Sequence, residues 1–143
     1  MAHYRTTVSS PWNIETAFGY MADFTHSATW DPGVTSAERL TSGEVGLGTK
    51  FALVAVFNGR PMPLTYEITA FDPPRRVVLR AVTSRVESID EVTFVTTATG
   101  TDVTYDATLR TRGSFRLAAP IVALLFRGIG ERARVGLARE LNR

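Results

Sequence analysis

The 143-residue sequence has no cysteine and only two histidines. Without cysteine there is no disulfide, no thiolate nucleophile and no cysteine-ligated zinc. Neither histidine has a second one nearby in the sequence, so we expect no metal site, which normally needs three or four ligands. Gly46 and Gly48 precede a predicted strand and lack the Lys-Ser/Thr ending of a phosphate loop, and no Gly-x-Ser-x-Gly elbow occurs. We predict no catalytic residue, metal or cofactor.

A strong net charge and a long apolar run are also missing. The formal net charge is +2, and the basic residues are dispersed among acidic ones, so we expect no nucleic-acid partner. The longest apolar run, Leu117–Phe126, has ten residues between two arginines, whereas a spanning helix needs about 20. We expect a buried helix there and no integral membrane association. The N-terminus lacks a basic region followed by an apolar stretch, which favours a cytoplasmic location.

The composition that remains is that of a folded globular chain. Hydrophobic residues make up 44% of the sequence and charged residues 21%, both close to the averages for soluble domains. The length is near the commonest size of one domain, and no linker or repeat divides it. We therefore expect one domain over residues 1–143.

The residue pattern predicts a strand, two short helices, six more strands and a long helix. The first strand covers about His3–Val8; Ser10 is the expected N-cap of the first helix, with Pro11 at its first position. The second short helix covers Phe24 to about Thr29. Alternating apolar residues and turn signals predict the other strands, which are Val34–Leu40, Thr49–Phe57, Pro63–Asp72, Arg76–Val82, Ser88–Thr97 and Val103–Thr111.

The last segment, about Ala118–Leu141, has the spacing of an amphipathic helix. Its expected apolar face consists of Ile121, Leu124, Leu125, Ile129, Ala133, Leu137 and Leu141. The order of elements indicates an α+β domain in which an antiparallel sheet packs one face on this terminal helix.

Several short motifs in this order resemble the SRPBCC superfamily, which includes START lipid-transfer domains, the birch-pollen allergen group and bacterial polyketide cyclase/dehydrase-like proteins. The motifs are Ser10-Pro11, Trp30-Asp31-Pro32-Gly33-Val34, Gly46-Leu47-Gly48-Thr49, Asp72-Pro73-Pro74-Arg75-Arg76-Val77 and Gly100-Thr101. The bacterial cyclase-like subgroup is the most similar. The resemblance implies a helix-grip fold, in which a seven-stranded curved antiparallel sheet wraps around the C-terminal helix. It also implies a hydrophobic cavity between the two.

Candidate ligand-binding residues follow from the strand alternation and from the expected cavity mouth. Tyr66, Tyr105 and Asp90 matter most, because a buried hydroxyl or carboxylate needs a partner. His26 and Trp30 are placed near the mouth. The remaining candidates are apolar, and for any single one of them plain core is the favoured role; they are Phe51, Leu53, Phe57, Ile68, Leu79, Val92, Phe94, Ala107, Leu109, Ile121 and Leu125.

Three functions remain open. The first is a noncatalytic carrier or sensor of a hydrophobic small molecule such as a lipid or polyketide. The second is an enzyme similar to polyketide cyclases or aromatases, in which polar cavity groups assist proton transfer. The third is a protein-interaction module with a filled cavity. The expected state is a monomer or homodimer.

Overall fold

The computed structural model describes all 143 residues and contains one seven-stranded antiparallel sheet. The spatial order of strands is β1-β7-β6-β5-β4-β3-β2. The strands are β1 (Ala2–Ser10), β2 (Val34–Arg39), β3 (Lys50–Phe57), β4 (Arg60–Asp72), β5 (Arg76–Val82), β6 (Val86–Thr96) and β7 (Thr101–Thr111). The helices are α1 (Ile14–Ala22), the 3-10 turn η1 (Phe24–His26), α2 (Ser27–Trp30), the 3-10 segment η2 (Gly113–Ala118) and α3 (Ala119–Glu140).

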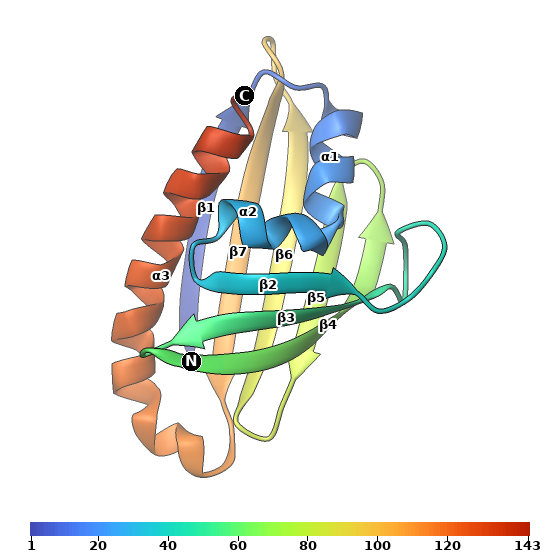
Figure 1. Cartoon of the computed structure of the whole chain (residues 1–143). Helices are drawn as coiled ribbons and strands as arrows, with labels where there is room; N and C mark the ends of the chain where they lie inside the picture. Colours follow the sequence, from blue (N-terminus) through green and yellow to red (C-terminus); the bar gives the residue numbers. More distant parts are fainter.

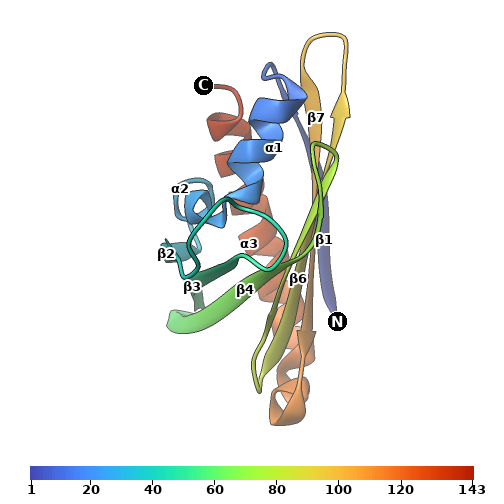
Figure 2. The same ribbon diagram turned by 90° about the vertical axis from the view of Figure 1, so that its right-hand side faces the viewer.

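The helices α1, α2 and α3 all lie on one face of the sheet (Figures 1 and 2). Register shifts between Val34 and Ser36 in β2, and between Ile68 and Ala70 in β4, bend that side of the sheet. In Figure 1, β2, β3 and β4 cross over the direction of β6 and β7 and curl towards α3. This arrangement is the predicted α+β helix-grip fold.

The first helix begins later than the sequence predicts. Asn13 is its N-cap, and the side-chain oxygen of Asn13 accepts a hydrogen bond from the Thr16 amide at 2.8 Å. Ser10 instead closes β1 opposite Thr101. The Ser10 hydroxyl donates to the Leu141 carbonyl at 2.6 Å and accepts from the Trp12 amide at 3.1 Å, but the helix itself begins only at Ile14.

The hairpin between β3 and β4 explains why β4 begins at Arg60 rather than at Pro63. Asn58 and Gly59 have positive φ angles of 52° and 76°, the geometry of a two-residue hairpin turn. Pro61 and Pro63 lie in the part of β4 that pairs with β3 alone, where the other edge is free. A proline is tolerated there because no ladder hydrogen bond is lost on the free edge.

The core lies between the sheet and the helices, and its largest fully buried side chains include Trp30, Phe24 and Phe51. Two glycines let α3 come close to its neighbours. A Cβ at Gly136 would overlap the Trp30 carbonyl oxygen, and one at Gly130 would overlap the Tyr4 ring.

Only the second half of α3 is buried as predicted. Ala133, Leu137 and the following Leu141 are buried, whereas Ile121 and Leu124 are 61% and 75% exposed. The apolar run Leu117–Phe126 is thus mostly on the surface, and the close contacts of α3 with β1 and α2 come later in the helix, at Gly130 and Gly136. By length and composition alone, Gly113–Glu140 would suffice to cross a membrane, and 11% of its most apolar window is buried.

Candidate ligand-binding cavity

The curled sheet, α2 and α3 enclose a cavity of about 110 Å³ with a mostly apolar wall. Its apolar lining includes Leu53, Phe57, Leu64, Ala107, Leu109 and Leu137. An apolar cavity of about 150 Å³ in another protein binds benzene. The space here is therefore of the order of one small ring.

One part of the wall is polar, and its groups come from β4, β6 and β7. The Tyr66 hydroxyl lies 2.7 Å from the Ser88 hydroxyl, and the Tyr105 hydroxyl donates to Asp90 Oδ2 at 2.7 Å. Ser88 and Asp90 are two residues apart in β6, so both point to the same face of the sheet. All four side chains are buried and line the cavity.

Burial sets the charge of this polar cluster. Desolvation raises the pKa of Asp90 to about 7; the Tyr105 hydrogen bond lowers it, and the nearby Asp31 and Asp106 raise it. Desolvation likewise raises the pKa of Asp31 to about 6, against the lowering effects of the Gly33 amide, which donates to Asp31 Oδ1 at 2.8 Å, and of Arg132. Near neutral pH the Asp90 carboxyl in the cavity is therefore protonated in part of the molecules.

Trp30 connects the polar groups to the helices. Its ring stands edge-on to the Tyr105 ring, with 5.3 Å between centroids and 72° between planes. The side chain is 1% exposed, and its Nε1–H is buried without a hydrogen-bond acceptor.

The structure brings eight of the predicted site residues together on the cavity wall: Trp30, Leu53, Phe57, Tyr66, Asp90, Tyr105, Ala107 and Leu109. Five others lie in the closed core, away from the wall: Phe51, Ile68, Leu79, Val92 and Phe94. They face inward as expected, but α1 and η1 cover that end of the sheet. The Phe94 ring packs on Phe18 at 5.2 Å between centroids, and Phe51 packs on Phe24 at 6.4 Å.

Ile121 and Leu125 lie outside the cavity, which corrects their predicted place. They line a separate surface groove of about 470 Å³ between the β3–β4 hairpin and the start of α3. Phe57 and Met62 border both the groove and the cavity. The prediction failed because it assumed that the whole length of α3 faces the sheet.

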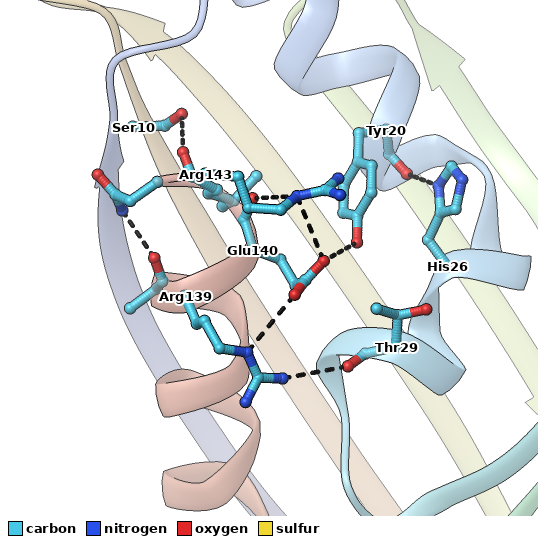
Figure 3. A network of polar contacts seen from close by, with 10 residues as sticks. Ser10, Tyr20, His26, Thr29, Arg139, Glu140 and Arg143 are labelled. Atoms are coloured by element: carbon cyan, nitrogen blue, oxygen red, sulfur yellow. Dashed lines mark hydrogen bonds and ion pairs between the residues drawn. The ribbon is translucent and has the colours of Figure 1, made fainter.

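His26 is also not on the cavity wall. Its Nδ1 lies 2.8 Å from the Tyr20 carbonyl oxygen, and its ring stacks on the Tyr20 ring at 4.3 Å (Figure 3). The Tyr20 hydroxyl in turn reaches Glu140 at 3.5 Å, and Glu140 pairs with Arg143. His26 thus belongs to a polar network that joins α1 to the C-terminus.

Sequence reasoning missed Asp31 and the wall residues contributed by the middle of α3. Asp31 sits in the Asp-Pro-Gly turn after α2, where nothing in the pattern indicates an inward side chain. Ile129 was expected on the apolar face of the helix, and it lines the cavity together with Phe126 and Gly130. No group of three or more His, Cys, Asp or Glu side chains is arranged to hold a metal ion.

The chain belongs to the family described as "Polyketide cyclase / dehydrase and lipid transport", which matches residues 1–142. A search of curated proteins finds no match. Among solved structures, the chain resembles a START superfamily protein from Mycobacterium smegmatis, with a TM-score of 0.80 and 14% identity over 99% of this chain and 97% of that one.

Of two further neighbours, one has a name that states an activity and the other does not. The Zhui aromatase/cyclase from Streptomyces sp. R1128 has a TM-score of 0.75 and 18% identity, over 97% of this chain and 90% of that one. The ginseng major latex-like protein 151 from Panax ginseng has a TM-score of 0.71 and 10% identity, over 99% and 98%. At these identities the likeness is one of fold, and one fold can host several activities.

Proposed function

We propose that the protein binds a hydrophobic small molecule, such as a lipid or polyketide, in the cavity between the sheet and α3, and acts as a carrier or sensor. The observation that carries the proposal is the composition of the cavity wall, in which 18 of 26 lining residues are hydrophobic and a few polar groups gather together. Such a wall is typical of sites that bury an apolar ligand and orient it by a few hydrogen bonds.

The cavity can be tested by filling it. Ala107 lies on the wall in β7, and its neighbour Thr108, which does not line the cavity, offers a matched control. We expect Ala107→Trp to weaken binding of an environment-sensitive hydrophobic dye by about tenfold or more, while Thr108→Trp binds as the parent does. Overpacking can cost about 1–3 kcal/mol, so a urea melt of each variant must accompany the titration.

Native mass spectrometry of the purified protein, with its copurified small molecules, would identify the ligand directly. If Ala107→Trp is folded and binds the dye as well as the parent, the dye site is on the surface and the proposal loses its support. A cytoplasmic location and a monomeric or homodimeric state belong to the same proposal, and light scattering coupled to size-exclusion chromatography measures the second.

The second candidate is a cyclase- or dehydrase-like enzyme, and one observation favours it. Asp90 is a cavity carboxyl with a pKa of about 7, next to the Tyr105 hydroxyl. A general acid or base works best when its pKa is near the working pH. The test is incubation with a linear poly-β-ketone. If the protein is an enzyme, cyclised product forms faster with it than in buffer alone, and more slowly with Asp90→Asn than with the parent. If it is a carrier, it binds the compound unchanged.

The third candidate, an interaction module with a filled cavity, is the least favoured. About 110 Å³ of space remains inside, and two tyrosines, Tyr66 and Tyr105, line it. If the parent protein does not bind the dye in the cavity in the experiment above, this third candidate becomes the favoured one.

A further inference from the structure

Two polar groups beside Tyr105 are left without protein partners. The Trp30 Nε1–H has no acceptor although Trp30 is 1% exposed. Asp90 uses one carboxyl oxygen, Oδ2, to accept from Tyr105, and no protein group donates to its other oxygen. Tyr105 touches both residues, since its ring packs on Trp30 and its hydroxyl binds Asp90. The unused donor and the unused acceptor therefore flank one side chain on the cavity wall.

The neighbouring polar side chains are already engaged with one another. The Tyr66 and Ser88 hydroxyls are paired, and the Ser27 hydroxyl donates to the Phe24 carbonyl at 2.6 Å. A buried N–H without an acceptor loses the hydrogen bond that it makes to water in the unfolded chain. Such a group is rare in native proteins, and here it belongs to a residue that lines a cavity with room for another molecule.

On the premise that the cavity binds a hydrophobic molecule, we propose that its ligand is a small apolar alcohol or phenol. Its hydroxyl accepts a hydrogen bond from Trp30 Nε1 and donates one to the free carboxyl oxygen of Asp90. A hydroxyl is the simplest group with both a donor and acceptor lone pairs. The free oxygen of Asp90 is an acceptor when the carboxyl is ionised, above its pKa of about 7, so the ligands are compared above that pH. Under that condition an ether or ketone supplies only the acceptor for Trp30, and an ammonium group supplies only donors.

The rest of the cavity limits the body of the ligand. Its volume of about 110 Å³ suits a single ring, and aromatic and branched side chains such as Phe24, Phe57 and Leu53 form the wall. The basic side chain on the wall, Arg134, is half-exposed and already paired with Glu131 at 2.8 Å. A carboxylate or phosphate on the ligand would therefore meet two acidic residues, the buried Asp90 and the partly buried Asp31, and no free buried cation.

A matched series of ring compounds separates these possibilities. The compounds are p-cresol, p-methylanisole, p-xylene and p-methylbenzylamine, which differ at one substituent. We expect p-cresol to bind about tenfold or more tightly than p-xylene, the size of effect that paired buried hydrogen bonds produce, with p-methylanisole between them. The Trp30 indole N–H signal in a two-dimensional NMR spectrum should move downfield with p-cresol and stay in place with p-xylene.

Two variants isolate the hydroxyl contact. Trp30→Phe removes the donor and also reshapes the wall, so the measured quantity is the ratio of the p-cresol affinity to the p-xylene affinity, which should fall towards one. Trp12→Phe is the control, because Trp12 packs against Tyr20 and Arg143 away from the cavity; it should keep the preference and also assigns the two indole signals. If Trp30→Phe does not fold, the affinity ratio and the indole shift in the parent still decide.

The outcomes distinguish this inference from the proposed function. If p-xylene binds as tightly as p-cresol, or p-methylbenzylamine binds tightest, the hydroxyl assignment is wrong while the apolar site stands. If none of the four compounds binds while the hydrophobic dye does, the single-ring hydroxyl ligand is wrong and the proposed function stands. If the dye does not bind either, the proposed function itself fails.

Discussion

Asp90 links the chemistry of the cavity to the stability of the protein. Its pKa is raised from 3.8 to about 7, chiefly because the carboxyl is buried. In the unfolded chain the same group ionises near its ordinary pKa, so between these values the folded state holds a proton that the unfolded state has lost. The free energy of unfolding therefore keeps the full contribution of Asp90 below about pH 4, and loses it as the pH rises from about 4 to about 7.

Asp90→Asn should remove this pH dependence. Asparagine keeps the shape and an oxygen for the Tyr105 hydroxyl but cannot ionise. We expect the free energy of unfolding of the variant to rise relative to that of the parent by up to about 1.4 kcal/mol per pH unit between about pH 4 and 7. Urea melts at a series of pH values measure the difference. Parallel profiles would mean that Asp90 is already ionised in the folded protein.

Asp31 shows the same effect over a lower range, because its pKa is raised to about 6. It remains ionisable in Asp90→Asn, so the variant profile should retain a shallower fall between about pH 4 and 6. The two carboxyls also repel each other. The difference between parent and variant therefore includes this coupling as well as the burial of Asp90.

At the scale of elements, strand alternation predicts much of the site, whereas contacts between elements do not follow from it. The period-two pattern was enough to place Tyr66, Asp90 and Tyr105 on the inner face of the sheet. It could not indicate where the cavity ends, because that depends on how far α1 and η1 cover the sheet. His26 was misplaced because its partner is the Tyr20 carbonyl, a backbone group that carries no sequence signal.

The exposed start of α3 has a related cause. Ile121 is apolar and has the correct helical spacing, yet it is 61% exposed. Whether such a residue is buried depends on where along the helix the sheet and α2 make contact. The turn residue Asp31 was missed because hydrogen bonding to the Gly33 amide, rather than periodicity, orients its side chain.

The contact between α2 and α3 can be tested with two glycines of the same helix. Gly136→Ala should destabilise the protein by about 1–3 kcal/mol, since the new Cβ would overlap the Trp30 carbonyl oxygen. At Gly128, the nearest atom to an added Cβ is the end of the Arg132 side chain, at 3.6 Å. Gly128→Ala should therefore stabilise α3 by up to about 1 kcal/mol through helix propensity.

Urea melts of both variants measure this pair of effects. Equal tolerance of alanine at the two positions would show that α2 and α3 are not in close contact. Because Trp30 also lines the cavity, Gly136→Ala should weaken dye binding as well, while Gly128→Ala should not.

Over the whole molecule, the two ends of α3 differ in how they are held. Near its C-terminus, Glu140 accepts a hydrogen bond from the Tyr20 hydroxyl of α1, and Arg139 lies near it on the same helix (Figure 3). The Ser10 hydroxyl at the end of β1 donates to the Leu141 carbonyl. The first turns of α3 form no comparable hydrogen bonds, and Val122 is the buried residue among them.

Hydrogen exchange should therefore divide α3 into two parts. Amides of about residues 119–126 should exchange much faster than those of 133–140, because local opening is easiest where few apolar contacts are lost. Exchange of the intact protein, read by mass spectrometry on overlapping peptides, measures this difference, and Ser10→Ala should raise exchange at the C-terminal end without changing the start. Uniform protection along α3 would mean that the exposed apolar residues Leu117, Ile121 and Leu124 are covered in solution. The groove beside them would then be an interface and not an open surface.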